Sequence, residues 1–600
     1  MPELLIDQRN LAFELYEVLD AEALTQRPRF ADHNRETFDA AIGTARTIAE
    51  KLFAPHNRKN DENEPKYVNG AAELIPEVKP AVDAFLEAGF LNATRSFEQG
   101  GMQMPNLLSQ ACFAHFQSAN AGTSSYAMLT MGAANLIESF GTEEQKERYL
   151  QPMIDGRFFG TMALTEPHAG SSLSDIRTKA EPAADGSYRL KGNKIFISGG
   201  DHPLSENIVH MVLAKLPDAP PGVKGISLFI VPKFLVNEDG TLGERNDVTL
   251  AGLFHKMGWR GTTSTALNFG DKDNCVGYLV GKPHHGLSYM FQMMNEARIG
   301  VGMGAVMLGY AGYLYSLDYA RNRPQGRSPA EKDPLSKPLN IIEHTDVKRM
   351  LLAQKCYAEG SLALCLLASR LVDEQEAAAT AEEREDSGIL LDLLTPVVKS
   401  FPSFYGPRAN DLAIQVLGGA GYTREYPVEQ CYRDNRLNPI HEGTNGIQAL
   451  DLLGRKIWQD QSHGLQLLMQ EMQADLQAAT TERCQQWALS LSETLQQAVK
   501  VTQSLGKSLM GGEVDKTLAN ASCYLHLFGH IIVAWMWLRQ ANASANALAS
   551  ANSDSERNFY QGKLQAAQYF FHWELPTVAQ DLVLLRNQDD TCLNMKADWF

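Results

Sequence analysis

The feature that most constrains the fold of this chain is a change in hydrophobic pattern, from helical to strand-like and back. Residues 35–160 carry apolar residues at helical spacing, short β-branched runs follow after Gly160, and helical spacing returns from about residue 285. This order predicts an α+β fold with an N-terminal helical domain, a middle antiparallel β domain, a C-terminal helical domain and an additional helical C-terminal domain. We expect these four domains at residues 1–160, 161–284, 285–455 and 456–600.

Local signals refine this prediction. Thr142 and Gln145 have the spacing of a capping box ahead of a helix over residues 146–153. Strands are expected at residues 208–213, 226–231 and 265–269. Loops are expected to interrupt the second helical region near residues 322–345 and 402–408.

Composition restricts the function without identifying it. Six hundred residues are too many for one hydrophobic core, so several domains are expected. A formal net charge of −17 disfavours nucleic acid or an anionic membrane as the main partner. Eight cysteines without CxxC spacing indicate reduced, mostly buried thiols rather than a disulfide framework or zinc site. The longest apolar run, Phe528–Leu538, is too short to span a bilayer and is typical of a buried helix. The acidic first residues resemble neither a secretory signal nor a transit peptide, which favours a cytoplasmic location.

The segment Tyr432–Gln448 holds the strongest catalytic candidate. It places the carboxylate Glu442 directly before Gly443, among amides, hydroxyls and apolar residues such as Ile440 and Ile447. Apolar neighbours desolvate a carboxylate, and desolvation raises its pKa towards that of a useful base. A different interpretation is that Glu442 caps the N–H groups at the start of a helix.

Two segments upstream, residues 162–172 and 194–200, combine small hydroxyl side chains with glycines. The hydroxyls can form hydrogen bonds with a bound group, and the glycines let the backbone come near it. Taken alone, the two segments could equally be a turn followed by an ordinary hairpin. Three further motifs follow in the chain, at Asn295–Gly300, Tyr319–Arg327 and Gln415–Tyr422. With the Glu442 segment, these motifs resemble in order those of the acyl-CoA dehydrogenases, flavoenzymes that desaturate acyl thioesters between Cα and Cβ. The resemblance spans most of residues 100–455.

The resemblance implies an acyl-CoA dehydrogenase-like fold, FAD as the cofactor, and a role for each matching residue. Glu442 would be the catalytic base. The residues implied in FAD binding are Leu164, Thr165, Ser171, Phe196, Ser198, Arg323, Gln415, Gly418, Gly419 and Thr444. The residues implied in acyl-CoA binding are Ser171, Asn295, Arg298, His441 and Gly443. Arg323 and Gln415 would reach the FAD of a neighbouring subunit, which predicts a homo-oligomer, with a dimer preferred.

Some positions depart from the family pattern. Phe196 stands where the family usually has Trp, and Ser198 where it usually has Thr. Asn295 stands where the family often has Asp, and Gly326 where it usually has Phe. Glu296 is a rival base, because some relatives carry their catalytic carboxylate on that segment, directly before the motif arginine. Here Ala297 occupies that place, which favours Glu442.

The implied reaction is FAD-dependent dehydrogenation of an acyl-CoA to trans-2-enoyl-CoA, with electron-transfer flavoprotein as the acceptor. An acyl-CoA oxidase would use the same residues but pass electrons to oxygen. A non-catalytic flavoprotein that binds nucleic acid exists on the same fold, and a pure interaction scaffold is a further alternative. Residues 456–600 hold ten basic and fourteen acidic residues, a net charge of −4, which disfavours nucleic-acid binding.

The chain continues past the shared core, and this tail resembles the long bacterial branch of the family, which includes fatty acyl-CoA and methylmercaptopropionyl-CoA dehydrogenases. Its leucines recur at helical spacing. We expect tail helices that bury one face against the rest of the protein and support the dimer.

Overall fold

The computed structural model describes residues 5–600, except the side chains of Gln292 and Asn295. The chain forms two compact units. The sheet unit comprises Glu36–Met104 and Cys112–Gly300, and the helical unit comprises Met1–Arg35, Pro105–Ala111 and Val301–Phe600. Both units are therefore assembled from segments that are far apart in the sequence.

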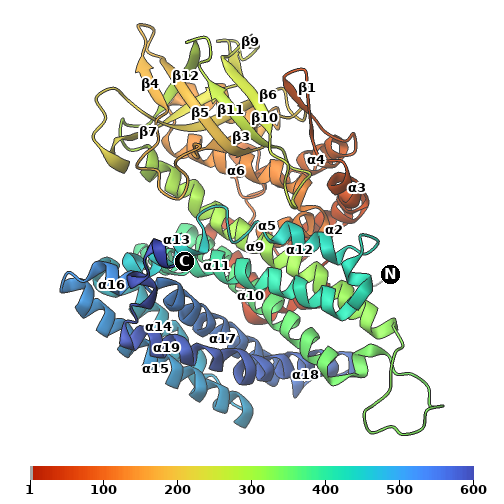
Figure 1. Cartoon of the computed structure of the whole chain (residues 1–600). Helices are drawn as coiled ribbons and strands as arrows, with labels where there is room; N and C mark the ends of the chain where they lie inside the picture. Colours follow the sequence, from red (N-terminus) through yellow and green to blue (C-terminus); the bar gives the residue numbers. More distant parts are fainter. Residues whose placement is uncertain (1–4) are drawn as a thin grey trace. The chain divides into compact units, whose positions relative to one another are not determined.

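In the described residues, one eight-stranded sheet forms the centre of the sheet unit (Figure 1). Its strands follow the order β10–β11–β5–β12–β7–β6–β3, and β4 pairs with β5 and β6. They are β3 (Phe158–Ala163), β4 (Lys179–Pro182), β5 (Tyr188–Ser198), β6 (Asn207–Lys215), β7 (Ile226–Pro232), β10 (Val248–Leu253), β11 (Ser264–Phe269) and β12 (Cys275–Val280). The predicted β domain is confirmed, and the three expected strands are β6, β7 and β11. Most pairs are antiparallel, but β3 and β4 pair with β6 in parallel.

Strands β6 and β7 are buried along almost their whole length, which explains why their sequences are continuous apolar runs. Side chains on β6 alternate between two buried clusters. Met211 and Leu213 enter the first cluster, whereas Val212 and Ala214 enter the second. Helix α6 (Ala121–Phe140) packs beside β3 and contributes to the first cluster.

The expected capping box is present before α7 (Glu143–Gln145). The Thr142 hydroxyl accepts from the Gln145 backbone N–H at 3.2 Å, and the Gln145 side chain accepts from the Thr142 N–H at 3.1 Å. Gln145 Nε2 also donates to the Leu279 carbonyl of β12 at 2.8 Å. The capping box therefore satisfies backbone N–H groups at the start of the helix. Through Gln145 it also attaches this helix start to the sheet.

The first region of the sheet unit is helical as expected, but it also contains a hairpin. Its helices are α2 (Arg35–Ile48), α3 (Asn57–Glu62), α4 (Val78–Glu87), α5 (Asn106–Ala119) and α8 (Gln151–Ile154), with the ends of α2 and α5 extending into the helical unit. Strands β1 (Lys66–Val68) and β2 (Ala71–Glu73) pair around Asn69 and Gly70, both at positive φ. An Asn-Gly pair is the usual signal for such a two-residue turn.

The second helical region contains α9 (Gly286–Asn322), α10 (Thr345–Ala377), α11 (Ala381–Leu417), α12 (Val428–Asn435) and α13 (Asn445–Gly454). The loop expected near residues 322–345 is present between α9 and α10. The break expected near 402–408 is wrong, because α11 continues through Pro402 and Pro407. Most residues of α11 after Leu390 are buried, and α11 packs along α10. Tertiary packing therefore outweighs the helix-breaking tendency of proline here.

The tail is helical, as predicted. It contains α14 (His463–Gln477), α15 (Glu482–Met510), α16 (Val514–Leu518), α17 (Ala521–Leu548), α18 (Asp554–Tyr569), α19 (Ala579–Asn587) and α20 (Thr591–Asn594). Within the helical unit, α17 packs against α10, α11 and α13 and also against tail helices α14, α15, α18 and α19 (Figure 1). The tail is thus part of the same core as the second helical region.

Two described helices, α10 and α17, are long and apolar enough to cross a membrane. In each, more than four fifths of the most apolar window is buried inside the protein, 89% in α10 and 83% in α17. Helices α10 and α17 also pack against each other. This burial confirms the prediction that Phe528–Leu538 belongs to a buried helix.

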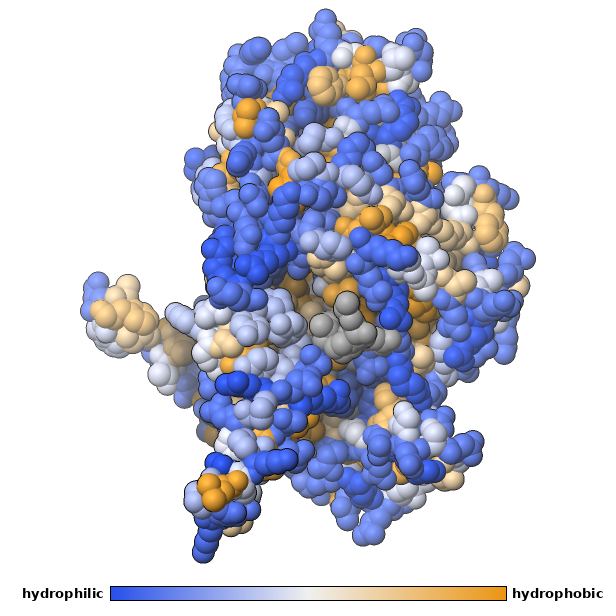
Figure 2. All heavy atoms as spheres, turned by 90° about the vertical axis from the view of Figure 1, so that its right-hand side faces the viewer, coloured by the Kyte–Doolittle hydropathy of each residue, from blue (hydrophilic) through white to orange (hydrophobic). Residues whose placement is uncertain are grey.

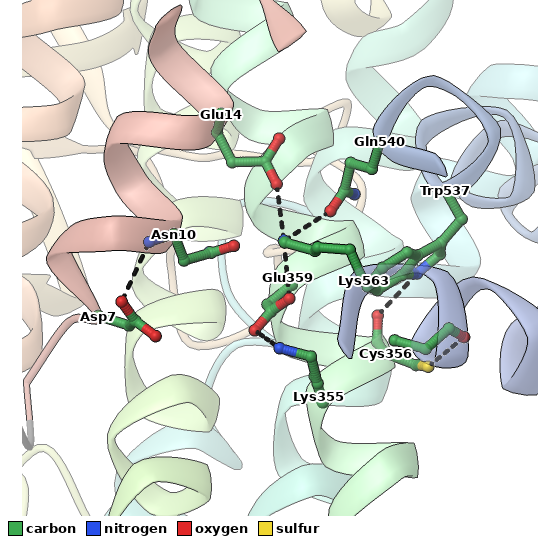
Figure 3. Close-up of polar contacts among 10 residues, drawn as sticks. Asp7, Asn10, Glu14, Lys355, Cys356, Glu359, Trp537, Gln540 and Lys563 are labelled. Atoms are coloured by element: carbon green, nitrogen blue, oxygen red, sulfur yellow. Dashed lines mark hydrogen bonds and ion pairs between the residues drawn. The ribbon is translucent and has the colours of Figure 1, made fainter. Parts of the chain in front are cut away.

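A buried group of charges joins the N-terminal segment to α10, α17 and α18 (Figure 3). Lys563 Nζ lies 2.8 Å from Glu359 Oε2, 3.3 Å from Glu14 Oε1 and 2.8 Å from Gln540 Oε1. Lys355 Nζ donates to the other Glu359 oxygen at 2.5 Å. Because Glu14, Glu359 and Lys563 are almost fully buried, each charge depends on the others for its stability.

The stability of this group should depend on pH through Glu14. Burial raises the pKa of Glu14 from about 4.5 to about 7, so the folded chain holds this proton more tightly than the unfolded chain. Stability contributed by the group is therefore present at acid pH and is lost as the pH rises from about 4.5 to about 7. Glu14→Gln should reduce the fall in thermal midpoint over this range relative to wild type. The exposed Glu22→Gln is the control, and equal slopes for wild type and Glu14→Gln would contradict this account.

Hydrophilic residues predominate on the molecular face drawn in Figure 2, in keeping with the net charge of −17. A few large apolar side chains of the helical unit are nevertheless strongly exposed. Tyr422 is 88% exposed and Leu335 is 89% exposed. Tyr422 ends the segment Gln415–Tyr422, which is predicted to contact a partner subunit. Leu335 lies in the loop that follows the other such segment, Tyr319–Arg327.

Candidate active site

In the sheet unit, the loop after β3 lies against β5. The Thr165 carbonyl accepts from the Ile195 backbone N–H at 2.9 Å. The neighbouring Leu164 carbonyl accepts from Lys194 Nζ at 2.8 Å. These bonds bring together the two segments that were predicted to face the flavin, although they are about thirty residues apart in the chain.

Phe196 lies at a bulge in β5. The register against β11 shifts between Thr265 and Leu267, and Phe196 has φ +58°, a conformation that non-glycine residues rarely adopt. Phe196 is 58% exposed, and its ring packs against that of Phe254 with ring centroids 4.4 Å apart. The bulge therefore presents an aromatic face at the surface of the unit, as an aromatic flavin contact requires.

The hydroxyl candidates differ in exposure. Ser198 ends β5, pairs with Ser264 of β11 and is half-buried. Leu164 and Thr165 are also half-buried. Ser171 is exposed in the loop that follows the tight turn between Glu166 and Ala169. The structure thus groups Leu164, Thr165, Phe196 and Ser198, with Ser171 on the same loop as Thr165.

In the helical unit, the predicted base segment joins α12 to α13. Glu442 has φ +54° and Gly443 has φ +84°. A Cβ at Gly443 would lie 2.6 Å from Gln448 Nε2, which donates to the Glu442 carbonyl at 3.2 Å. The turn therefore requires glycine at 443, and it holds Glu442 in a strained conformation of the kind found at functional sites.

The cap of α13 is Thr444, whose hydroxyl accepts from the Ile447 backbone N–H at 3.3 Å. Glu442 lies two residues earlier, outside the helix. The N-cap position of α13 is therefore occupied by Thr444 and not by Glu442. A carboxylate near a helix N-terminus is also stabilised by the helix dipole.

A series of hydrogen-bonded asparagine side chains supports this segment. His441 Nε2 lies 3.0 Å from Asn438 Oδ1, and Asn438 Nδ2 donates to Asn435 Oδ1 at 2.9 Å. Asn435 Nδ2 donates to Asn410 Oδ1 at 2.8 Å and to the Ala305 carbonyl at 3.0 Å. The base segment is thus linked to α11 and α9. Sequence reasoning noted the amides of this segment but missed Asn410, which is 25 residues from its partner Asn435.

Lys399 is a further functional candidate that sequence reasoning missed. It is fully buried on α11, and its Nζ donates to Asn445 Oδ1 at 3.1 Å in the first turn of α13. Burial, with a contribution from the Lys399 charge, lowers the pKa of His441 to about 3. His441 is therefore a neutral imidazole near neutral pH. An isolated lysine in an apolar helix gave no signal in the sequence.

Two of the acyl-CoA candidates, Asn295 and Arg298, lie on the part of α9 that belongs to the sheet unit. Arg298 is 3% exposed. The side chain of Asn295 lies outside the described residues. Glu296, the rival base, is exposed and accepts from Asn135 Nδ2 at 2.8 Å. Glu296 thus belongs to a surface polar contact, which fits a solvated residue better than a desolvated base.

The candidates for the neighbouring subunit's FAD are all exposed on the helical unit. Arg323 follows α9, and Gln415, Gly418 and Gly419 mark the end of α11. Gly418 has φ +62°, and its N–H donates to the Gln415 carbonyl. The rings of Tyr319 and Tyr426 lie 6.1 Å apart, so the end of α9 and the segment after α11 meet. Exposure of all four residues is what contact with a second copy requires.

Comparison with known proteins identifies the family. Four family models match successive parts of the chain: "Acyl-CoA dehydrogenase, N-terminal domain" at 35–157, "Acyl-CoA dehydrogenase, middle domain" at 161–272, "Acyl-CoA dehydrogenase, C-terminal domain" at 284–458, and "Acetyl-CoA dehydrogenase C-terminal like" at 468–596. Together they define a flavin-dependent oxidoreductase. The chain belongs to the acyl-CoA dehydrogenase family, in a form with an additional C-terminal region.

Individual relatives agree over nearly the whole chain. The chain is 36% identical to 3-methylmercaptopropionyl-CoA dehydrogenase of Ruegeria pomeroyi, over 87% of each protein. It is 34% identical to a butyryl-CoA dehydrogenase of Syntrophomonas wolfei, over 99% of each protein. The solved acyl-CoA dehydrogenase complexed with FAD from Bacillus anthracis has the same fold, with a TM-score of 0.73, 21% identity, and coverage of 95% of this chain and 92% of that chain. The predicted family, fold, enzyme class and FAD cofactor are therefore confirmed.

Proposed function

We propose that this acyl-CoA dehydrogenase converts an acyl-CoA to the trans-2-enoyl-CoA, with Glu442 as the base that removes the α-proton. The observation that carries the proposal is the conformation of residues 441–444. Glu442 is held at positive φ by a glycine turn, outside a helix that Thr444 already caps. A base must be held in one orientation towards its proton, and a strained, well-supported turn provides this.

FAD, when bound, supplies the acceptor of the β-hydrogen as hydride at flavin N5. The residues proposed to hold the flavin ring are Leu164, Thr165, Ser171, Phe196, Ser198 and Thr444. The exposed ring of Phe196 and the hydroxyls around it fit a flavin, which needs an apolar face and hydrogen-bonding edges. The Glu442 backbone N–H is proposed to donate to the thioester oxygen, a contact that typically contributes a few kcal/mol to such reactions.

The acyl-CoA is proposed to contact Ser171, Asn295, Arg298, His441 and Gly443. Arg298 suits the CoA moiety because a guanidinium binds phosphate oxygens in a fork geometry. A neutral His441, held by Asn438, can orient the segment without adding charge beside Glu442. Assay of a panel of acyl-CoAs of increasing length, with an artificial electron acceptor, would test the activity and assign the chain length.

The proposed electron acceptor is electron-transfer flavoprotein, in the cytoplasm. The acyl-CoA oxidase alternative predicts that the substrate-reduced enzyme is reoxidised rapidly by oxygen. We expect slow reoxidation by aeration and rapid reoxidation by electron-transfer flavoprotein after anaerobic reduction. Rapid reoxidation by oxygen alone would favour the oxidase instead. Fractionation of cells that make the protein would test the location.

We also propose that the four domains divide at residues 160, 284 and 455, and that the enzyme is a homodimer with shared FAD sites. The family models change close to these positions, at 157–161, 272–284 and 458–468. Exposure of Arg323 and Gln415 supports the shared site.

If Arg323 holds the partner's FAD, Arg323→Ala should lower FAD occupancy without unfolding the chain. Loss of a charge-assisted contact to phosphate typically weakens binding by about tenfold or more. Absorbance of bound flavin per protomer measures occupancy, and sedimentation with and without FAD measures the oligomer. The exposed neighbour Arg321→Ala is the control and should match wild type. Unchanged occupancy in Arg323→Ala, or an apoprotein of unchanged mass and stability, would contradict the shared site.

A further inference from the structure

A buried ion pair joins the two flavin-facing segments of the sheet unit. Lys194, on β5, has no exposed side-chain surface, and Glu166, in the loop after β3, is 3% exposed. Lys194 Nζ lies 2.9 Å from Glu166 Oε1 and donates to the Leu164 carbonyl at 2.8 Å. The ammonium group therefore contacts both the backbone and a side chain of the loop.

Glu166 in turn closes the loop at its far end. Its Oε1 accepts from the Thr178 backbone N–H at 3.0 Å and from the Thr178 hydroxyl at 2.6 Å. Its Oε2 accepts from the Arg177 backbone N–H at 2.6 Å. One carboxylate thus connects Glu166, near the start of the loop that carries Ser171, with the last two residues of that loop.

The same pair sets the position of Thr165 relative to Phe196. Thr165 lies between the two residues, Leu164 and Glu166, that Lys194 contacts, and its own carbonyl accepts from Ile195. Phe196 follows Ile195 directly at the bulge of β5. A shift of Lys194 or Glu166 would therefore move the hydroxyl of Thr165 and the ring of Phe196 against each other.

We propose that Lys194 and Glu166 act as a positioning clamp for the flavin ring, by locking the loop of Thr165 and Ser171 onto the Phe196 bulge. The inference rests on the proposed function, in which these three residues contact FAD. Both clamp residues are buried and act through Thr165, Ser171 and Phe196, so they are positioning residues. A buried ion pair adds little net stability compared with apolar packing, so its contribution here is the geometry that it imposes.

The charge state of the pair provides a second test of the proposal, through its dependence on pH. Burial lowers the pKa of Lys194 to about 8, against the opposing attraction of Glu166. Burial would raise the pKa of Glu166, but the Lys194 charge and the hydrogen bonds from Thr178 and Arg177 lower it overall. His168 also lies near the pair, with its Nε2 3.6 Å from Glu166 Oε2. Lys194 is therefore charged at neutral pH and loses its charge in the folded chain above about pH 8.

The test compares holoenzymes of Lys194→Met, Glu166→Gln and the double variant, with Lys191→Met as the control. Lys191 lies on the same strand, in an exposed pair with Asp273. Each protein is measured for FAD dissociation constant, bound-flavin midpoint potential and thermal unfolding without FAD. Lys194→Met should weaken FAD binding by about tenfold and shift the potential, because it leaves a buried carboxylate without its cation. The double variant, with a neutral amide that still bonds Thr178, should recover part of the affinity.

A pH series separates positioning from simple destabilisation. FAD affinity of wild type and Lys191→Met should fall above about pH 8, whereas the double variant should lack this fall. If all variants keep the wild-type FAD affinity, potential and pH profile, the clamp is refuted. If Lys194→Met and the double variant lose FAD only in proportion to their loss of apoprotein stability, with no pH difference, the clamp is likewise refuted. Failure of wild-type enzyme itself to be reduced by any acyl-CoA would refute the proposed function and not the clamp.

Discussion

Glu442→Gln should nearly abolish flavin reduction by acyl-CoA while FAD and acyl-CoA remain bound. The amide keeps the size of the carboxylate, so the glycine turn at Gly443 and the cap at Thr444 should be unaffected. It cannot accept the α-proton, and a positioned general base contributes about 10²–10⁴-fold to a rate. Anaerobic rapid mixing with acyl-CoA, followed by flavin absorbance, measures the rate of reduction directly.

The rival carboxylate provides the matched control for this experiment. Glu296→Gln replaces an exposed carboxylate that accepts from Asn135 with an amide, and flavin in this variant should be reduced at close to the wild-type rate. FAD content and acyl-CoA affinity should be equal in both variants. Rapid flavin reduction by Glu442→Gln, together with loss of activity in Glu296→Gln, would move the base to α9.

Trp537→Ala should cause the largest loss of stability of any single substitution proposed for this protein. Trp537 on α17 is fully buried, and its Nε1 donates to the Cys356 carbonyl of α10 at 3.2 Å. Its indole fills a notch at Gly360, where a Cβ would lie only 2.6 Å from Nε1. Removing so large a side chain typically costs about 3–5 kcal/mol. Chemical denaturation followed by fluorescence or circular dichroism measures the free energy of unfolding.

The exposed Trp573→Ala is the control, since its ring is 58% exposed. Surface substitutions of this kind usually change stability by about 0.5 kcal/mol or less. A Trp537→Ala protein as stable as this control would show that α17 does not hold the helical unit together.

Deletion of the residues after about 460 tests the same role on a larger scale. It removes α17 and exposes the faces of α10, α11 and α13 that α17 covers. We expect aggregation or loss of the dimer, because such faces are apolar. Because α13 begins just after Glu442, the loss should also disturb the base segment. A truncated protein that stayed soluble and dimeric, yet transferred electrons differently, would instead make the tail a regulator of the acceptor site.

Much of this architecture could be predicted because it depends on short-range pattern. The strand runs that became β6, β7 and β11, and the Thr142–Gln145 cap, are specified by residues within a few positions of one another. The helical tail could be predicted for the same reason. The β1–β2 hairpin was missed, although Asn69 and Gly70 carry its turn signal, because the surrounding pattern is helical.

The prediction failed where long-range packing decides the conformation. Pro402 and Pro407 suggested a break in α11, yet burial against α10 keeps the helix continuous. Lys399 and Asn410 carry no local signal, since their importance lies in contacts with Asn445 and Asn435. The positive φ of Phe196 also could not be foreseen, because a bulge depends on the register of the neighbouring strand.

The sequence by itself determined the succession of helical and sheet regions, because local spacing carries that information. Its motifs, through their resemblance to a known family, also indicated the family, its cofactor and the candidate site residues. Only the tertiary structure decided how those candidates are held. It placed the strained turn at Glu442, the hydrogen-bonded asparagines that support His441, the Lys194–Glu166 pair and the burial of α17. Each of these depends on groups that are distant in the chain and become neighbours only when the core excludes water, where an unpaired charge or a misplaced side chain is costly.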